Sequence, residues 1–151
     1  MLISVQQEDF DVSAITRQLC AQRKDVGAVA SFTGLVRDQS PTEDLVALEL
    51  EHYPGMTQKA LESIAQQAMQ RWDIPDLAII HRVGKLLPQD NIVLVVTISA
   101  HRKDAFDACA FLMDYLKTQA PFWKKEITRD GESWVASRAS DEHAAQSWED
   151  K

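Results

Sequence analysis

The sequence predicts a single α+β domain that combines a mixed or antiparallel sheet with packed helices. Its 151 residues suit one hydrophobic core, so we treat 1–151 as one domain. Strand-like and helix-like patterns alternate irregularly, and several strands are adjacent along the chain, which is typical of α+β proteins. Hydrophobic residues make up 45% and charged residues 26%, as in an ordinary globular protein.

The first third of the chain predicts a strand, a helix and a second strand. Leu2–Gln6 has strand length. Ser13–Gln22 is a helix because Ile15 and Leu19 are spaced four residues apart on one face. Val26–Val36 is rich in Val, Ala, Phe and Thr, and it predicts a buried strand.

The next segment predicts a loop, a half-buried strand and a long helix. Gln39–Asp44 holds Ser, Pro, Thr and two acids, which favours a loop. Val46–His52 alternates apolar and other residues with a period of two. Pro54-Gly55 then interrupts the chain, and Thr57 can cap the apolar helical pattern of Thr57–Trp72.

The second half predicts two strands, a helix and a hairpin. Leu77–Val83 and Asn91–Ala100 are strands joined by a turn at Pro88–Asp90, and Lys103–Thr118 is a helix that ends before Pro121. The hairpin and the tail complete the chain: strands Phe122–Thr128 and Ser133–Ser137 flank Arg129-Asp130-Gly131, and the polar tail 140–151 is compatible with a helix.

Charge and composition exclude several classes of protein. The net charge of −7 argues against a general nucleic-acid binder. The N-terminus lacks the pattern of a signal peptide, and the longest apolar run, Ile92–Ile98, is too short to span a membrane. We therefore expect a cytoplasmic protein. No GxGxxG or Walker sequence supports binding of a nucleotide.

Neither the cysteines nor the histidines predict a metal site or a disulfide. The two cysteines fit no disulfide framework, and the four histidines show no HxxxH or HExxH spacing. Cys109 could serve as a nucleophile, but it falls within the apolar part of the predicted helix, where a thiol behaves as a small hydrophobic group. Cys20 has the same character.

Lysine residues near the end of that helix are candidates for a functional site. Phe106, Ala110, Met113 and Lys117 share one stripe, so Lys117 ends a stripe that we expect to face the core. The alternative is that its stem covers apolar surface while its ammonium reaches water. A functional role gains weight from the segment that follows.

Anion-binding residues surround this position in the sequence. Phe122 and Trp123 precede Lys124 and Lys125, a pattern that suits a flat ring next to an anion, although an ordinary strand with solvated lysines would look the same. Three further cations lie where strands end or helices begin, which favours anion binding. They are Arg37, His101 and Arg102.

Four motifs resemble one enzyme family. They are F-T-G-x-V-R at Phe32–Arg37, E-H-Y-P-G-M at Glu51–Met56, A-H-R at Ala100–Arg102 and M-D-Y-L-K-T-x-A-P-F-W-K at Met113–Lys124. In these motifs, and across 27–138, the chain resembles the large, catalytic subunit of molybdopterin synthase.

The resemblance implies a fold, an activity and partners. The fold would be of the α/β-hammerhead type, and the subunit would form a homodimer that binds two small ubiquitin-like sulfur-carrier subunits, giving a heterotetramer. The activity would be a sulfur transfer from the carrier's C-terminal Gly-Gly thiocarboxylate to cyclic pyranopterin monophosphate, which produces molybdopterin. No cofactor is implied, and the sulfur arrives on the partner.

The resemblance also assigns site residues. Lys117 and Lys124 would be catalytic, and the remaining residues would bind substrate. Arg37 with the backbone of Leu35 and Val36 would hold the phosphate, and the other protomer would add three cations. The full set of substrate-binding residues is Phe32, Leu35, Val36, Arg37, His101, Arg102, Met113, Lys117, Lys124, Lys125, Glu126 and Arg138.

One position departs from the family, and two other functions stay open. Family members often have lysine where this chain has Leu35; we expect only the main chain to matter there because Arg37 is retained. The alternatives to a sulfur transferase are a non-catalytic module that docks a ubiquitin-like partner and a thiol-dependent enzyme that uses Cys109.

Overall fold

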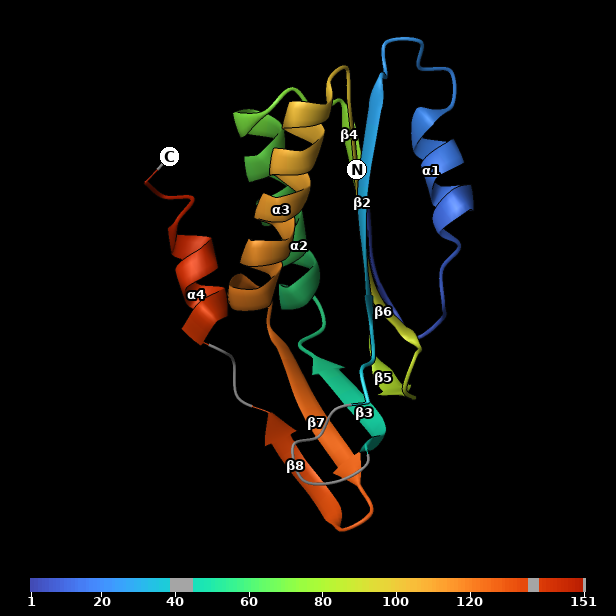
Figure 1. Ribbon diagram of the computed structural model, residues 1–151, viewed down its shortest axis with the longest axis vertical. Helices are drawn as coiled ribbons and strands as arrows, with labels where there is room; N and C mark the ends of the chain where they lie inside the picture. The colour runs from blue at the N-terminus through green and yellow to red at the C-terminus, as the bar shows by residue number, and fades with distance from the viewer. Residues whose placement is uncertain (39–44, 136–138, 151) are drawn as a thin grey trace.

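Two four-stranded sheets and four helices make up the part of the chain that the structure describes. The computed structural model describes residues 1–38, 45–135 and 139–150. The sheets follow one another along the long axis of the molecule, and the helices pack around the upper sheet (Figure 1). The predicted α+β class is confirmed, with the strands divided between two sheets.

The first sheet is mixed and has helices on both faces. Its strand order is β1-β4-β6-β2, with β1 parallel to β4 and the other pairs antiparallel. The strands are β1 (Leu2–Gln6), β2 (Ala28–Leu35), β4 (Asp76–Arg82) and β6 (Asn91–Ser99). Helix α1 (Val12–Cys20) covers one face, and helices α2 (Met56–Arg71) and α3 (Arg102–Gln119) cover the other (Figure 1).

Alternation along β4 shows how the first sheet divides the core. Ala78 and Ile80 pack in the apolar cluster beneath α1, whereas Leu77 and Ile79 pack in the larger cluster beneath α2 and α3. Successive side chains of a strand point to opposite faces, so a continuous apolar run fills two cores at once.

The second sheet is antiparallel and has the order β5-β3-β7-β8. Its strands are β3 (Leu45–His52), β5 (Gly84–Leu86), β7 (Phe122–Thr128) and β8 (Gly131–Val135). The short β5 lies between the two strands that the sequence predicted to be joined by a turn, and it was missed because three residues show no periodicity. A third apolar cluster, which includes Val36, Leu48 and Leu86, lies where the two sheets meet.

The polar C-terminal segment docks on the body of the domain. It contains helix α4 (Ala139–Gln146) and the buried Trp148. The indole of Trp148 packs edge-on against Trp72 and Phe111, with ring centroids 5.5 and 5.8 Å away, and its Nε1 donates to Asp114 at 2.7 Å. One aromatic anchor therefore holds a largely polar helix against α3.

Strand β2 contradicts the expectation that Val26–Val36 is a buried strand. It forms an edge of the first sheet, and the exposed fractions of Val29, Phe32 and Leu35 are 45%, 43% and 54%. Helix α1 packs mainly on the inner strands β4 and β6 and not on this edge. Apolar composition predicted the strand but not its uncovered position.

Two local predictions were wrong for identifiable reasons. Thr57 is not the helix cap: α2 begins after Gly55, whose φ of 83° suits glycine, and the Thr57 hydroxyl donates to the Pro121 carbonyl at 3.1 Å. In β3, a register shift between Leu45 and Ala47 moves Val46 to the exposed side.

Candidate functional site

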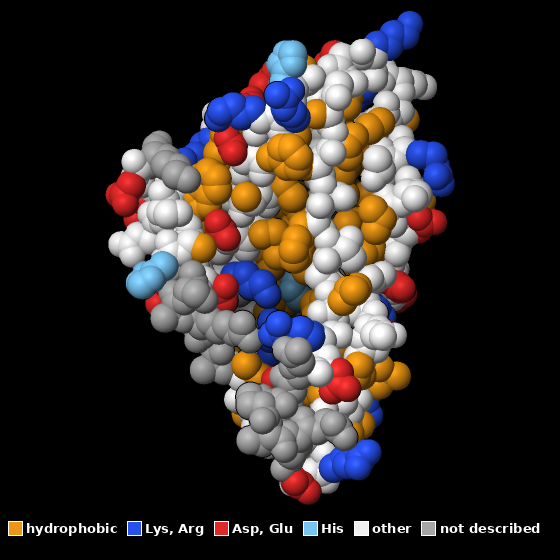
Figure 2. Space-filling model, viewed as in Figure 1, with side chains coloured by type: hydrophobic (Ala, Val, Ile, Leu, Met, Phe, Trp, Pro, Cys, Tyr) orange, Lys and Arg blue, Asp and Glu red, His pale blue; other side chains and the backbone are white. Residues whose placement is uncertain are grey.

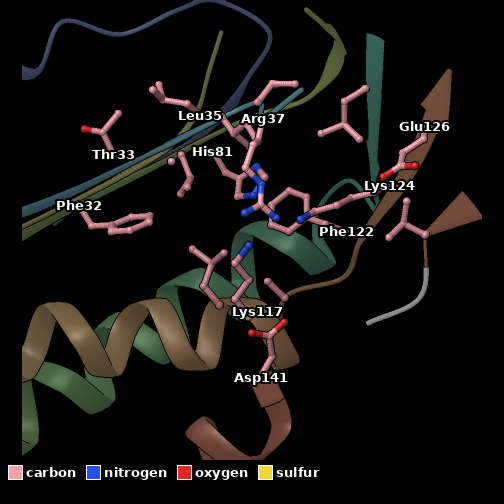
Figure 3. A pocket seen from close by; sticks show the side chains of 18 of the residues that line it. Phe32, Thr33, Leu35, Arg37, His81, Lys117, Phe122, Lys124, Glu126 and Asp141 are labelled. Atoms are coloured by element: carbon pink, nitrogen blue, oxygen red, sulfur yellow. The ribbon is translucent and has the colours of Figure 1, made fainter. Parts of the chain in front are cut away.

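A cavity of about 490 Å³ opens where the two sheets meet the C-terminal end of α3. Segments distant in the sequence contribute to its wall, among them the end of β2, the end of β4, the last turn of α3, the start of β7 and the beginning of α4 (Figure 3). Apolar side chains such as Phe32, Ile92, Leu116 and Phe122 line it beside the charged groups. The cavity is therefore suited to a ligand with a flat ring and an anionic group.

Three cations converge on this cavity. Lys117 extends from the last turn of α3 toward the guanidinium of Arg37 and the ammonium of Lys124 (Figure 3). Two carboxylates, Glu126 and Asp141, also line the wall. Cations held close together attract phosphate, and arginine can form two parallel hydrogen bonds to it. The structure thus brings together Arg37 from one motif with Lys117 and Lys124 from another.

Alternation along β7 decides which residues of the Phe-Trp-Lys-Lys segment reach the cavity. Phe122, Lys124 and Glu126 line it, whereas Trp123 and Lys125 lie on the opposite face of the strand. The predicted flat-ring contact therefore involves Phe122 and not Trp123.

Lys125 is engaged on that opposite face. Its ammonium is 3.5 Å from a carboxylate oxygen of Glu49 and 3.3 Å from one of Glu132, and it lies 5.4 Å from the Trp134 ring centroid. Hydrogen bonding and attraction to Glu132 and Glu49 raise the pKa of Lys125. The structure does not bring this predicted substrate contact to the cavity.

The stripe that ends at Lys117 does not face the core, contrary to expectation. Phe106 is 65% exposed and Ala110 is exposed, while the buried face of α3 carries Phe111, Leu112 and other residues. The helix has two apolar stripes, and its sequence does not say which one meets the sheet. Lys117 reaches the cavity because α3 ends there. Met113, one turn earlier, is partly buried and does not line the cavity.

His101 and Arg102 lie at the far end of α3. Both are exposed at its N-terminus, and the 18 residues of the helix separate them from the cavity. At a rise of 1.5 Å per residue the helix is about 27 Å long, which neither side chain can span. They do not belong to the cavity of their own chain. Arg138 lies outside the described residues.

The main chain next to Arg37 is already hydrogen-bonded. The amide of Val36 donates to the Asp90 carbonyl at 2.8 Å, and its carbonyl accepts from the Gln89 amide at 2.8 Å. The backbone of Val36 therefore offers no spare donor for phosphate. Leu35 lines the cavity, with its side chain 54% exposed.

Sequence reasoning missed two titratable residues that line the cavity, His81 and Asp141. His81 ends the buried part of β4, stacks on Phe122 with ring centroids 3.7 Å apart, and has a pKa lowered by burial to about 4. Side chains of a strand alternate between its two faces, so the spacing from Leu77 would have placed His81 on the α3 side of the sheet. No sequence signal marked Asp141, because it reaches the cavity only through the docking of α4.

The cysteines lie elsewhere. Cys109 is buried in the core beneath α3, and burial raises the pKa of its thiol to about 11. Neither cysteine lines the cavity.

Among the residues that the structure describes, no group of three His, Cys, Asp or Glu side chains is arranged to hold a metal ion. The helices described here include none that is long and apolar enough to cross a bilayer.

Comparisons with known proteins give this cavity a family context. Residues 5–119 match the model of the MoaE protein family. The molybdopterin synthase catalytic subunit of Ralstonia nicotianae is 56% identical over 97% of this chain and 83% of its own. That of Pseudomonas aeruginosa is 53% identical over 99% of this chain and all of its own.

Solved structures agree with the sequence comparison. A molybdopterin biosynthesis MoaE protein from Burkholderia ambifaria is 54% identical, with a TM-score of 0.84 over 98% of this chain and 97% of its own. A complex of subunits 1 and 2 of molybdopterin-converting factor from Helicobacter pylori is 22% identical, with a TM-score of 0.76 over 91% and 92%, and shows the shared fold. The resemblance seen in the sequence motifs is confirmed: the chain belongs to the MoaE protein family.

Proposed function

We propose that this chain is the catalytic subunit of a molybdopterin synthase. It would transfer sulfur from the C-terminal thiocarboxylate of a small ubiquitin-like carrier to cyclic pyranopterin monophosphate, giving molybdopterin. The observation that supports this most is the meeting of Arg37, Lys117 and Lys124 in one cavity. The name of close relatives such as the Ralstonia protein supports the same reaction.

The three cations would have different tasks. Arg37, whose guanidinium suits bidentate contacts, would hold the substrate phosphate. Lys117 and Lys124 would lie beside the reacting carbons and the thiocarboxylate, where an ammonium stabilises negative charge that develops during sulfur transfer. The two lysines come from separate elements, so a ligand between them would be held from two sides.

The sulfur would come from a second protein. The sequence has two cysteines, and neither lines the cavity, so the chain offers no thiol there. The Helicobacter structure is described as a complex of two subunits, which is consistent with a small partner for this chain. We expect the Gly-Gly tail of that partner to enter the cavity, and we expect the reaction to need no cofactor and to occur in the cytoplasm.

A homodimer would complete the site. Apolar side chains gather over α3 and β2 on the face shown in Figure 2. Both elements carry exposed large apolar side chains, for example Phe106 on α3 and Val29 on β2. His101 and Arg102 cannot reach the cavity of their own chain, but a second copy packed on this face could supply them. With one carrier at each end, the assembly would be a heterotetramer.

The central experiment is mass spectrometry of pyranopterin after incubation with this chain and a thiocarboxylated carrier. We expect a product that has gained two sulfurs. The Lys117→Ala variant should still bind the carrier but should form little product. A non-catalytic docking module would give no product with either protein, and unimpaired turnover by the variant would refute the role of Lys117.

The shared site has its own test. Arg102→Ala and Lys117→Ala each remove a different cation that would contribute to one shared cavity. If residues cross between protomers, mixing the two inactive variants should restore part of the activity, because some mixed dimers contain one intact site. No recovery after verified subunit exchange would show that each chain builds its site alone.

Cys109 provides the test of the thiol alternative. Because it is buried and its thiol stays protonated near neutral pH, Cys109→Ser should keep most of the turnover. Loss of turnover in a variant that is still folded would favour the thiol enzyme.

A further inference from the structure

His81 occupies a special place at the end of β4. The alternation of the strand turns its side chain to the same face as Leu77 and Ile79, toward α2 and α3. Those two residues lie in the core, but His81 lies where α3 ends and the cavity begins, so its ring lines the cavity while only 4% of the residue is exposed. A polar ring thus stands where the alternation of the strand would place the next apolar core side chain.

Two contacts fix the orientation of this ring. It stacks on Phe122 with centroids 3.7 Å apart and an interplanar angle of 16°. Its Nδ1 lies 2.8 Å from the carbonyl oxygen of Arg82. A carbonyl can only accept, so Nδ1 carries the hydrogen, and Nε2 of the neutral ring holds a lone pair.

Nε2 is available to a ligand. Within the described part of the chain, every fully buried side-chain nitrogen or oxygen has a partner. The hydrogen bond of His81 is made by Nδ1, so Nε2 must have access to the cavity that the ring borders.

The surroundings keep this ring neutral. Burial chiefly lowers the pKa of His81, to about 4, and the charges of Lys124 on β7, Lys117 on α3 and His52 on β3 act in the same direction, while the hydrogen bond to Arg82 opposes them. Arg37 lines the same cavity. An acceptor with a negative charge would be attracted to these cations, whereas a neutral nitrogen held by stacking stays where it is.

We propose that His81 orients the substrate, with Nε2 accepting a hydrogen bond from a ring N–H of the bound pterin while Arg37 and the lysines hold the phosphate. A pterin carries N–H and amino donors at one edge, which match a neutral acceptor that is held in a fixed orientation by the stack on Phe122. His81 then helps to distinguish a pterin from other phosphorylated rings. This inference rests on the proposed function and adds a residue to it.

Direct binding measurements test the contact without the carrier and without turnover. Calorimetry would compare pyranopterin with inorganic phosphate for wild type, His81→Phe and His81→Gln. Phenylalanine keeps the stack on Phe122 but removes the acceptor, so pterin affinity should fall by about tenfold while phosphate affinity stays unchanged. Glutamine, which can present an oxygen, should recover part of the loss.

The outcomes separate this inference from the proposed function. Equal pterin affinity in His81→Phe and wild type would overturn the role of His81 alone. An equal loss of pterin and phosphate affinity in both variants would show a merely structural role. If folded wild type binds phosphate but no pterin, the proposed function itself fails.

Nitrogen NMR on ¹⁵N-histidine-labelled protein adds a readout that a structural role would not move. The Nε2 resonance of His81 should be that of a lone-pair nitrogen and should shift on addition of pterin but much less on addition of phosphate. An Nε2 that is protonated in the ligand-free protein would overturn the proposal, because no lone pair would then be available to the pterin.

Discussion

The two faces of strand β7 carry similar residues in different environments. On one face, Phe122 and Lys124 line the cavity; on the other, Trp123 is 47% exposed and Lys125 lies between two carboxylates. Each face thus has one aromatic ring and one lysine. The comparison teaches that residue type does not decide function here; the direction of the side chain relative to β4 and α3 does.

The largest expected difference is between the two adjacent lysines. Lys124→Ala removes a cation beside the reacting groups, so turnover should fall by about 10²–10³-fold, as for other lost charge-stabilising groups. Lys125→Ala removes ion pairs at the surface, so turnover should stay close to wild type. Steady-state assays with saturating carrier would measure both, and a comparable loss in the two variants would break the comparison.

The second largest expected difference is between the aromatic residues Phe122 and Trp123. Phe122→Ala removes the stack on His81 and part of the cavity wall, so it should lower the free energy of unfolding by about 2–3 kcal/mol and weaken substrate binding. Trp123→Ala should change that free energy by only about 0.5 kcal/mol, as surface substitutions usually do. Denaturant titrations of both variants would measure the two losses of stability. A larger loss in Trp123→Ala than in Phe122→Ala would contradict the assignment of Phe122 to the cavity face of β7.

Buried neutral His81 should make stability depend on pH. The pKa of His81 falls from 6.5 to about 4 on folding, so between these values the unfolded chain takes up a proton that the folded chain does not. Stability is therefore lost as pH falls from 6.5 to 4, by an order of about 3 kcal/mol, and is unaffected above that window. Unfolding curves of wild type and His81→Phe, subtracted at each pH, should show this slope; parallel curves would contradict it.

The smallest effect concerns Asp141, which lines the cavity near Lys117 (Figure 3). Its carboxylate competes with an anionic ligand for the cations, so Asp141→Asn should raise the affinity for inorganic phosphate by about twofold at low salt and by less at high salt. Calorimetry at two ionic strengths would measure this. Weaker phosphate binding in the variant would mean that the carboxylate positions the cations instead.

The sequence by itself determined the class of fold and nearly every element. Helix α3 has a long helical pattern, and strand β7 lies between Pro121 and the Arg129-Asp130-Gly131 turn; both lie within one or two residues of their predicted bounds. The motifs around Arg37, Lys117 and Lys124 also indicated the family and the three cations that meet in the cavity. Local patterns suffice for such predictions because they depend on residues close together in the chain.

Only the tertiary structure decided which face of each helix and strand is buried and which lines the cavity. Periodicity says that Phe106 and Lys117 share a stripe of α3, but not that the stripe lies outside the core. It likewise could not reveal that His81 meets Phe122, 41 positions away in the printed sequence, or that Trp148 anchors the tail and brings Asp141 to the cavity. Such contacts depend on which surfaces are buried when distant segments pack together, and that choice is made by the whole fold.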